Sequence, residues 1–244
     1  MNYKVRVSRR ARRVILRLDE GGGLEVTIPS GFDPAGIAAV VAAHQSWIEE
    51  RRKRLASRPP EPAEPFPPAV IPLRALEKEV AVRFGPERHG PPRLTYSPAF
   101  RLDLSGDWSR IEDGRYLLRC WLLRMGRIHF KPWLDRLSLE TGLAYRRFGV
   151  RDQKTRWGSC SNRGAISLNG KLLFFPPRYA RYVMLHELCH TVHLNHSDRF
   201  WSLLARFESD CRSLDRELRR TREYIPHWAN GRPMRPGEEQ SDMI

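Results

Sequence analysis

The sequence of 244 residues is poor in cysteine and has no long apolar stretch. Its four cysteines, Cys120, Cys160, Cys189 and Cys211, stand far apart without a CxxC pair, which argues against a disulfide scaffold and a zinc ribbon. Such usage fits a reducing compartment, so we expect a cytoplasmic protein. The longest stretch without Asp, Glu, Lys or Arg covers residues 34–48, fewer than the roughly 18 apolar residues of a membrane span. The first residues also lack the apolar core of a signal peptide, so we expect no membrane association.

Acidic residues are in deficit. There are 43 Lys and Arg against 28 Asp and Glu, which gives a formal net charge of +15. Most of the cations are arginines spread along the whole chain, a pattern that biased genome composition explains as well as a binding surface does. Clusters at residues 9–13 and 51–54 leave nucleic-acid binding open, although a solvated hairpin face and a helix C-terminus also accommodate such charges.

The N-terminal part, residues 1–57, has the pattern of a β-hairpin followed by a helix. Apolar and polar residues alternate over 14–18 and again over 24–28, as in strands with one apolar face. The glycine run at 21–23 suits the turn between them. Asp33-Pro34 resembles a helix start, and the apolar periodicity predicts a helix to about Leu55.

Prolines punctuate residues 58–72, which we expect to form a linker because proline lacks the amide donor that helices and central strands need. The main domain should cover 73–225, with strands near 80–84 and 93–104 and a long helix over 114–139. Further strands are expected at 165–169 and 172–175, after a turn at 162–164. The tail, 226–244, should be mobile. These elements predict an α+β fold.

An HExxH pattern carries the chemistry. His186 and His190 are one helical turn apart, so both imidazoles project from one helix face and can reach one ion at about 2.0–2.1 Å. Glu187 lies about 100° further round the helix, where its carboxylate could take a proton from a water that the metal activates. The surrounding apolar residues indicate a largely buried helix, in which unpaired ionisable groups are costly. We therefore expect a zinc site with one ion.

A catalytic zinc site needs a third protein ligand, and three alternatives are open. His193 shares the helix face of His186 but lies about 10.5 Å along the axis if the helix continues, which is too far. His196 could swing back if Asn195 adopts a left-handed conformation and ends the helix. Glu208 or Asp210 on the following helix could also serve. We favour His196.

Substrate binding is expected around the same helix. The strands that contain Arg156 and Ser167 could present an edge that pairs with an extended peptide. Arg156, Tyr182 and His193 are candidates for stabilising the oxyanion, and the pattern does not choose among them. Cys160 lacks an evident local partner, which argues against a nucleophilic thiol.

These residues together make the sequence similar to the YgjP-like metal-dependent hydrolases, relatives of the SprT/Spartan zinc metallopeptidases. The matching segments are 156–161, 168–169, 176–177, 182–183, 186–190, 195–197 and 200–201. The resemblance covers about residues 3–215. It implies a zincin-like metallopeptidase domain with His186, His190 and His196 as zinc ligands and Glu187 as catalytic base. The C-terminal cysteine zinc ribbon common in SprT-type proteins is absent.

The sequence therefore predicts a zinc-dependent metallopeptidase that hydrolyses peptide bonds in a peptide or protein substrate. One alternative is a basic nucleic-acid-binding protein with a structural zinc site, and another is a zinc hydrolase of a non-peptide substrate. Glu187 favours catalysis, because a structural site has no use for a glutamate beside its first ligand. No feature indicates an oligomeric state.

Overall fold

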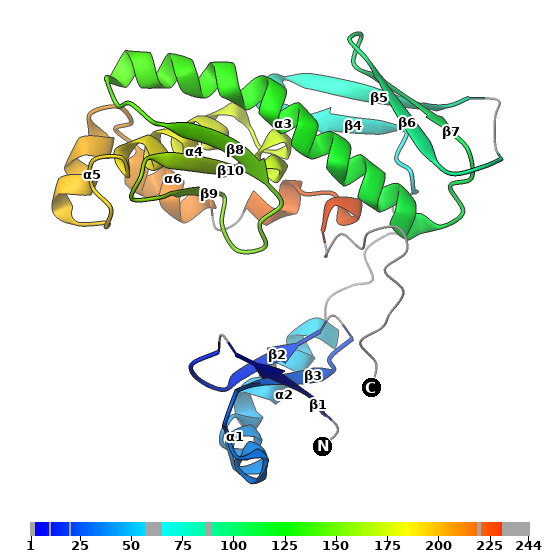
Figure 1. Ribbon diagram of the computed structural model, residues 1–244, viewed down its shortest axis with the longest axis vertical. Coiled ribbons are helices and arrows are strands. Elements are labelled where there is room, and N and C mark those ends of the chain that lie inside the picture. The colour runs from blue at the N-terminus through cyan, green and yellow to red at the C-terminus, as the bar shows by residue number, and fades with distance from the viewer. Residues whose placement is uncertain are drawn as a thin grey trace. The chain divides into compact units, whose positions relative to one another are not determined.

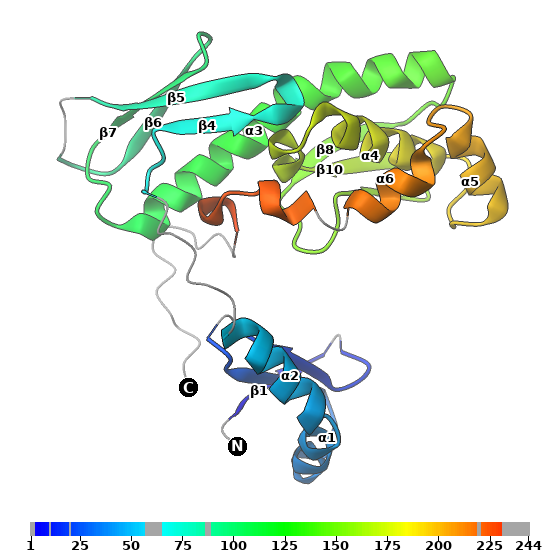
Figure 2. The ribbon, with the colours of Figure 1, turned by 180° about the vertical axis from the view of Figure 1, so that it is seen from behind.

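The computed structural model describes residues 3–9, 11–19, 21–56, 65–85, 89–218 and 221–230. The chain divides into two compact units, Met1–Ala63 and Glu64–Ile244, which are described separately (Figures 1 and 2). The boundary between them falls within the stretch expected as a linker, of which residues 58–64 lie outside the described residues.

The first unit contains a three-stranded sheet. Its strands are β1 (Tyr3–Ser8), β2 (Ile15–Leu18) and β3 (Leu24–Pro29), in the order β1-β3-β2. The antiparallel β2–β3 pair confirms the predicted hairpin, with Gly22 at a positive φ of 79° in its turn. The parallel strand β1 was not predicted, because its apolar residues Val5 and Val7 remain exposed and give no signal of a buried face.

Two helices cover this sheet where one was expected. After a 3-10 turn (η1, Pro34–Gly36), α1 (Ile37–Ala43) and α2 (Gln45–Ala56) are separated at His44, whose backbone leaves the helical region with φ −112° and ψ 16°. The Asp33 carboxylate accepts a hydrogen bond from the Ala35 amide at 2.9 Å, so the predicted helix start is confirmed. The core of this unit joins strand and helix residues, namely Leu24, Val26, Ile28, Ile37, Val41 and Ile48.

The second unit begins with a four-stranded sheet. Strands β4 (Val70–Leu73), β5 (Lys78–Phe84), β6 (Arg93–Ser97) and β7 (Arg101–Ser105) lie in the order β4-β5-β7-β6. The end of the expected linker is therefore a strand. Pro72 is compatible with β4 because this strand lies at the sheet edge, where a missing amide donor is tolerated.

A long helix, α3 (Ile111–Thr141), runs past both sheets of this unit (Figure 1) and confirms the helix expected at 114–139. The second sheet consists of β8 (Arg147–Arg151), β9 (Gly158–Cys160) and β10 (Ala165–Asn169), in the order β8-β10-β9. Strand β8 is parallel to β10 and β9 is antiparallel to it. The strand expected at 172–175 is instead part of a 3-10 helix, η3 (Gly170–Phe174), because the Asn169 side chain accepts a hydrogen bond from the Lys171 amide and starts a helical turn.

Three helices follow, α4 (Pro177–Cys189), α5 (Asp198–Ala205) and α6 (Cys211–Leu218). Short 3-10 turns, η4 (Thr221–Tyr224) and η5 (His227–Ala229), end the described chain. The start of the expected mobile tail is thus ordered. Trp228 is buried against Phe174, and the Asn230 carbonyl accepts a hydrogen bond from Arg119 at 3.3 Å. Residues 231–244 lie outside the described residues.

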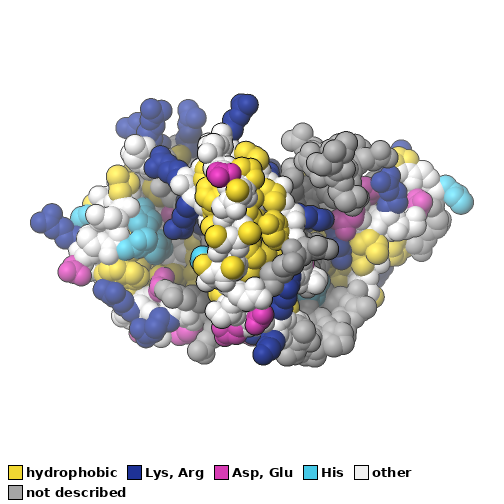
Figure 3. Space-filling view, turned by 90° about the horizontal axis from the view of Figure 1, so that it is seen from below, with side chains coloured by type: hydrophobic (Ala, Val, Ile, Leu, Met, Phe, Trp, Pro, Cys, Tyr) yellow, Lys and Arg dark blue, Asp and Glu magenta, His cyan; other side chains and the backbone are white. Residues whose placement is uncertain are grey.

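Two surface properties bear on the expectations from composition, namely the apolar character of the helices and the positions of the basic side chains. Among the described helices, none combines the length and apolar character that crossing a membrane requires. Figure 3 shows Lys and Arg side chains of the described residues projecting from the surface at several places.

Candidate metal centre

Three histidines converge at the C-terminal end of α4. His186 lies on the last turn, His190 caps the helix, and His196 comes from the loop before α5. The Nε2 atom of His186 lies 3.2 Å from that of His190 and 2.9 Å from that of His196. Their candidate ligand atoms all lie within 4.8 Å of one another. The structure thus brings together the three histidines that the sequence singled out.

The way His196 returns differs from the expectation. Helix α4 ends at Cys189, and the amides of Val192 and His193 both bond to the Cys189 carbonyl in the turn that follows. Among the described residues other than glycine, positive φ values occur only at Glu77 and Phe100, so Asn195 is not left-handed. The early end of the helix, and not a left-handed residue, therefore directs His196 towards the other two rings.

Hydrogen bonds determine which nitrogen of His186 carries its proton. The Tyr182 hydroxyl lies 3.4 Å from His186 Nδ1 and donates to Asp215 at 3.2 Å. A hydroxyl has one proton to give, so Nδ1 of His186 is the donor to Tyr182. The lone pair of His186 is then on Nε2, on the side where the three rings meet.

His190 is held in the same tautomer by an independent contact. Its Nδ1 lies 2.8 Å from the backbone carbonyl oxygen of His193, which can only accept. His190 therefore carries its proton on Nδ1 and points the Nε2 lone pair at the cluster. His193, expected at the substrate, contributes here through its backbone.

One aromatic ring packs against all three imidazoles. Phe200 on α5 is fully buried and stacks on His190 with ring centroids 4.6 Å apart. Its ring also contacts His186 at 4.8 Å and His196 at 4.9 Å, both edge to face. This packing limits rotation of the imidazoles and closes the apolar side of the cluster.

Two of the three rings, those of His186 and His190, are kept neutral. Burial, with smaller contributions from His190 and His196, lowers the pKa of His186 to about 3. Burial also lowers the pKa of His190. Since a metal binds the neutral imidazole, both rings have the protonation state that ligation requires at neutral pH.

The donor set fits a zinc ion. His186 Nε2 faces the Nε2 lone pair of His190 at 3.2 Å with no proton between them, and His196 Nε2 lies 2.9 Å from the same atom. A shared cation removes this conflict. Tetrahedral bonds of 2.0–2.1 Å would separate the nitrogens by about 3.3–3.4 Å, close to the 3.2 and 2.9 Å seen here.

Glu187 is buried beside the histidines, with 5% of its surface exposed. Its Oε2 atom has no hydrogen-bond partner among the described residues. Burial raises the pKa of Glu187 to about 8, although the charge of Arg156 opposes this shift. An orphaned buried carboxylate oxygen is costly, which indicates that a partner such as substrate or solvent belongs there.

Two residues expected at the substrate, Tyr182 and Ser167, have buried side chains. Tyr182 is 1% exposed, and its hydroxyl lies on the Nδ1 side of His186, away from the converging Nε2 atoms. The Tyr182 hydroxyl thus positions a histidine. Ser167 lies on the central strand β10, where it is buried and its hydroxyl has no partner among the described residues. Arg156 is exposed in the loop before β9 and acts on Glu187 through its charge, so its predicted place near the site is retained.

The alternative ligands, Glu208 and Asp210, do not join the three histidines. Glu208 forms an ion pair with Arg181 at 2.5 Å. Neither Glu208 nor Asp210 belongs to the metal-binding group found among the described residues. The Cys160 thiol is kept protonated, because burial and the Glu187 charge raise its pKa to about 11. This agrees with the expectation that Cys160 is not a nucleophile.

The sequence did not indicate two contributors to the site. These are Asp215, which accepts a hydrogen bond from Tyr182, and Phe200, whose ring packs against the three imidazoles. Both lie on helices after the HExxH segment, where apolar residues recur at helical spacing over 200–218, a pattern typical of core packing. The one available signal was the acidic residue Asp215 directly after a buried position, Leu214.

Comparison with known proteins agrees with this geometry. A family model described as YgjP-like, metallopeptidase domain, matches residues 12–221. The chain belongs to the YgjP-like family. As a member of this family it is a metallopeptidase, with a divalent metal implied. No curated protein matches the chain.

Two crystal structures show a distant likeness to this YgjP-like protein. The jannalysin zymogen of Methanocaldococcus jannaschii is 18% identical, with a TM-score of 0.34, over 37% of this chain and 94% of its own. The abylysin zymogen of Pyrococcus abyssi is 19% identical, with a TM-score of 0.35, over 38% of this chain and 94% of its own. Both are metallopeptidase zymogens. At this similarity we base the family assignment on the family model alone.

Proposed function

We propose that the protein is a zinc-dependent peptidase in which His186, His190 and His196 hold one Zn²⁺ and Glu187 is the catalytic base. The observation that carries the proposal is the convergence of three histidine Nε2 atoms beside a buried carboxylate with an orphaned oxygen. A structural zinc site would explain the histidines but not Glu187.

Each residue has a task in this scheme. Zinc bound there would supply Lewis acidity, which polarises a scissile carbonyl and makes water acidic enough to attack near neutral pH. Glu187 takes the proton from the attacking water and delivers it to the leaving amine. Tyr182 with Asp215, and the carbonyl of His193, keep the ligand tautomers fixed.

Strand β9 lies at the edge of its sheet in the part of the chain that the structure describes, and this edge offers a place for an extended peptide. The Trp157 carbonyl and the Ser161 amide bond to β10, and hydrogen-bonding residues alternate along an antiparallel strand. The backbone groups of Gly158 and Cys160 therefore point away from β10. A substrate strand that pairs with these groups would run beside Glu187, which supports a peptide or protein substrate.

The experiment is Glu187→Gln, which keeps the shape of the side chain and removes its basicity. We expect zinc to remain bound while hydrolysis of a peptide library falls by about 10²–10⁴-fold, the usual contribution of a general base. Glu208→Gln removes a carboxylate outside the cluster and should keep its activity. Full activity in Glu187→Gln with zinc bound would remove Glu187 from its assigned role.

A further inference from the structure

Strand β9 passes so close to α4 that one of its residues has to lack a side chain. A Cβ atom built on Gly158 would lie 2.5 Å from Oε1, 2.6 Å from Cγ and 2.8 Å from Cδ of Glu187. These separations are well inside van der Waals contact. The φ of Gly158 is not in the left-handed region, so backbone conformation does not require glycine here. The contact with Glu187 does.

We propose that Gly158 is a positioning residue for Glu187, and that the segment from Asp152 to Gly158 is a rigid wall that holds the carboxylate at the metal cluster. This inference rests on the proposed role of Glu187 as base. It identifies the segment that orients the Glu187 carboxylate. The spacing of residues within the HExxH helix does not reveal this segment.

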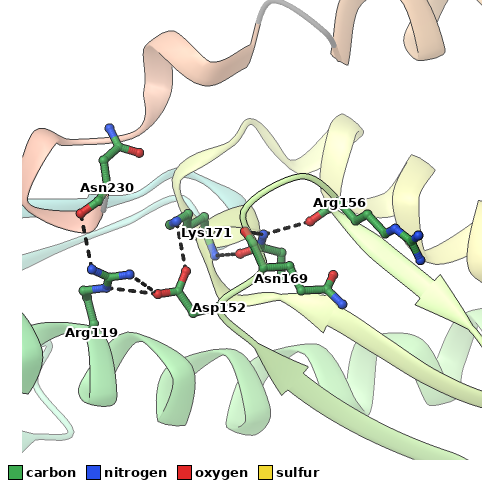
Figure 4. A network of polar contacts seen from close by, with 7 residues as sticks. Arg119, Asp152, Arg156, Asn169, Lys171 and Asn230 are labelled. Atoms are coloured by element: carbon green, nitrogen blue, oxygen red, sulfur yellow. Dashed lines mark hydrogen bonds and ion pairs between the residues drawn. The ribbon is translucent and has the colours of Figure 1, made fainter. Parts of the chain in front are cut away.

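The end of the wall is pinned by Asn169, which is fully buried on β10. Its side-chain amide donates to the carbonyls of Gln153 at 2.8 Å and Arg156 at 2.9 Å (Figure 4). Its backbone amide donates to the Trp157 carbonyl at 2.8 Å. Three hydrogen bonds from Asn169 therefore hold the wall at residues 153, 156 and 157, the last of them next to Gly158.

Buried ion pairs hold the start of the wall at Asp152. The Asp152 carboxylate is bound by the guanidinium of Arg119 and, at 2.9 Å, by Lys171 Nζ (Figure 4). All three side chains are largely buried, with 14% or less of each exposed. Arg119 comes from α3 and Lys171 from η3, so the wall is fastened to two elements that flank the second sheet.

The wall explains how Glu187 can stay where it is. A buried carboxylate with an orphaned oxygen would lower its free energy by rotating towards any available donor. An ideal Cβ on Gly158 would lie within 2.8 Å of Oε1, Cγ and Cδ of Glu187, so the backbone of β9 packs directly against this side chain and limits its rotation. Because the methyl group of an alanine at 158 would also crowd Cγ, the Glu187 side chain could not make room for it by moving only its far end.

The test compares Gly158→Ala with Gly149→Ala on strand β8 of the same sheet, where an added Cβ would meet nothing within 4 Å. In the zinc-loaded protein we expect Gly158→Ala to retain one zinc and to lose about 10²-fold in kcat, the scale of a displacement of roughly 1 Å. Gly149→Ala should stay within about twofold of the wild type. Equal kcat values in the two variants would overturn the proposal.

A second measurement does not depend on activity or on zinc. In the metal-free protein, Gly158→Ala should lower Tm by about 3–8 °C through overpacking. In a Glu187→Ala background, the same change should lower Tm by no more than about 1 °C, because the crowded atoms are gone. The same Tm loss in both backgrounds would overturn the contact itself. The Tm measurements thus test the contact between Gly158 and Glu187 separately. They can support this contact even if the Glu187→Gln variant shows that Glu187 is not the catalytic base.

Discussion

Tyr182→Phe removes one oxygen atom from behind His186 and leaves the three proposed ligands in place. The lost hydroxyl lies between Asp215 at 3.2 Å and His186 Nδ1 at 3.4 Å. Without it, His186 loses the contact that keeps its proton on Nδ1. Part of the metal-free population can then carry the proton on Nε2, where it has to be displaced before a metal binds.

The size of the effect follows from the length of these bonds. Loss of a group that orients a metal ligand typically costs 10–100-fold in affinity. Both bonds of Tyr182 are longer than the common 2.7–3.0 Å, so we expect the lower end, about tenfold in zinc Kd or about 1.4 kcal/mol. The metal-free protein should lose about 0.5–1.5 kcal/mol of unfolding free energy.

The assay is competition for zinc with a chromophoric chelator, and α4 supplies the matched control. Tyr179 lies on the same helix and is also buried, and its hydroxyl donates to Glu217 at 3.0 Å. Tyr179→Phe should therefore cost similar unfolding free energy while leaving zinc Kd unchanged. A zinc Kd for Tyr182→Phe equal to that of Tyr179→Phe would refute the tautomer argument.

Two further changes test the supports of the site by urea unfolding. Asp152→Asn removes one member of a buried ion-pair network that includes Arg119 and Lys171, so unfolding free energy should fall by about 3–5 kcal/mol. Glu50→Gln, in an ion pair exposed on the surface, should cost no more than about 1 kcal/mol, and similar losses in both would contradict the burial argument. Phe200→Ala removes the ring beneath the three imidazoles and should cost about 3–5 kcal/mol, with weaker zinc binding; unchanged zinc binding would show that the ring does not orient them.

The sequence predicted the parts of the fold that local periodicity determines. The β2–β3 hairpin, the long helix α3 and the HExxH helix α4 each follow from spacing within a few turns or residues. Strands β1 and β8 were missed, and both pair in parallel with a partner distant in sequence. Such pairing leaves no turn signal between the two strands.

The residues of the site also fall into those that local spacing predicts and those that only tertiary packing brings together. His186 and His190 were placed by helical spacing alone, and His196 was favoured for a chain reversal that occurs by a different route. The contact of Gly158 with Glu187 and the bond of Tyr182 to Asp215 join residues 29 and 33 positions apart, in elements whose packing no local pattern specifies. These tertiary contacts required the structure.

The most direct test of the account is the metal content of the purified protein, measured by mass spectrometry for the wild type, His196→Ala and His193→Ala. We expect one zinc per chain in the wild type and loss of zinc in His196→Ala. His193→Ala should keep its zinc, because the backbone carbonyl that holds His190 remains. A wild type without zinc, or zinc bound as tightly in His196→Ala as in the wild type, would contradict the three-histidine centre.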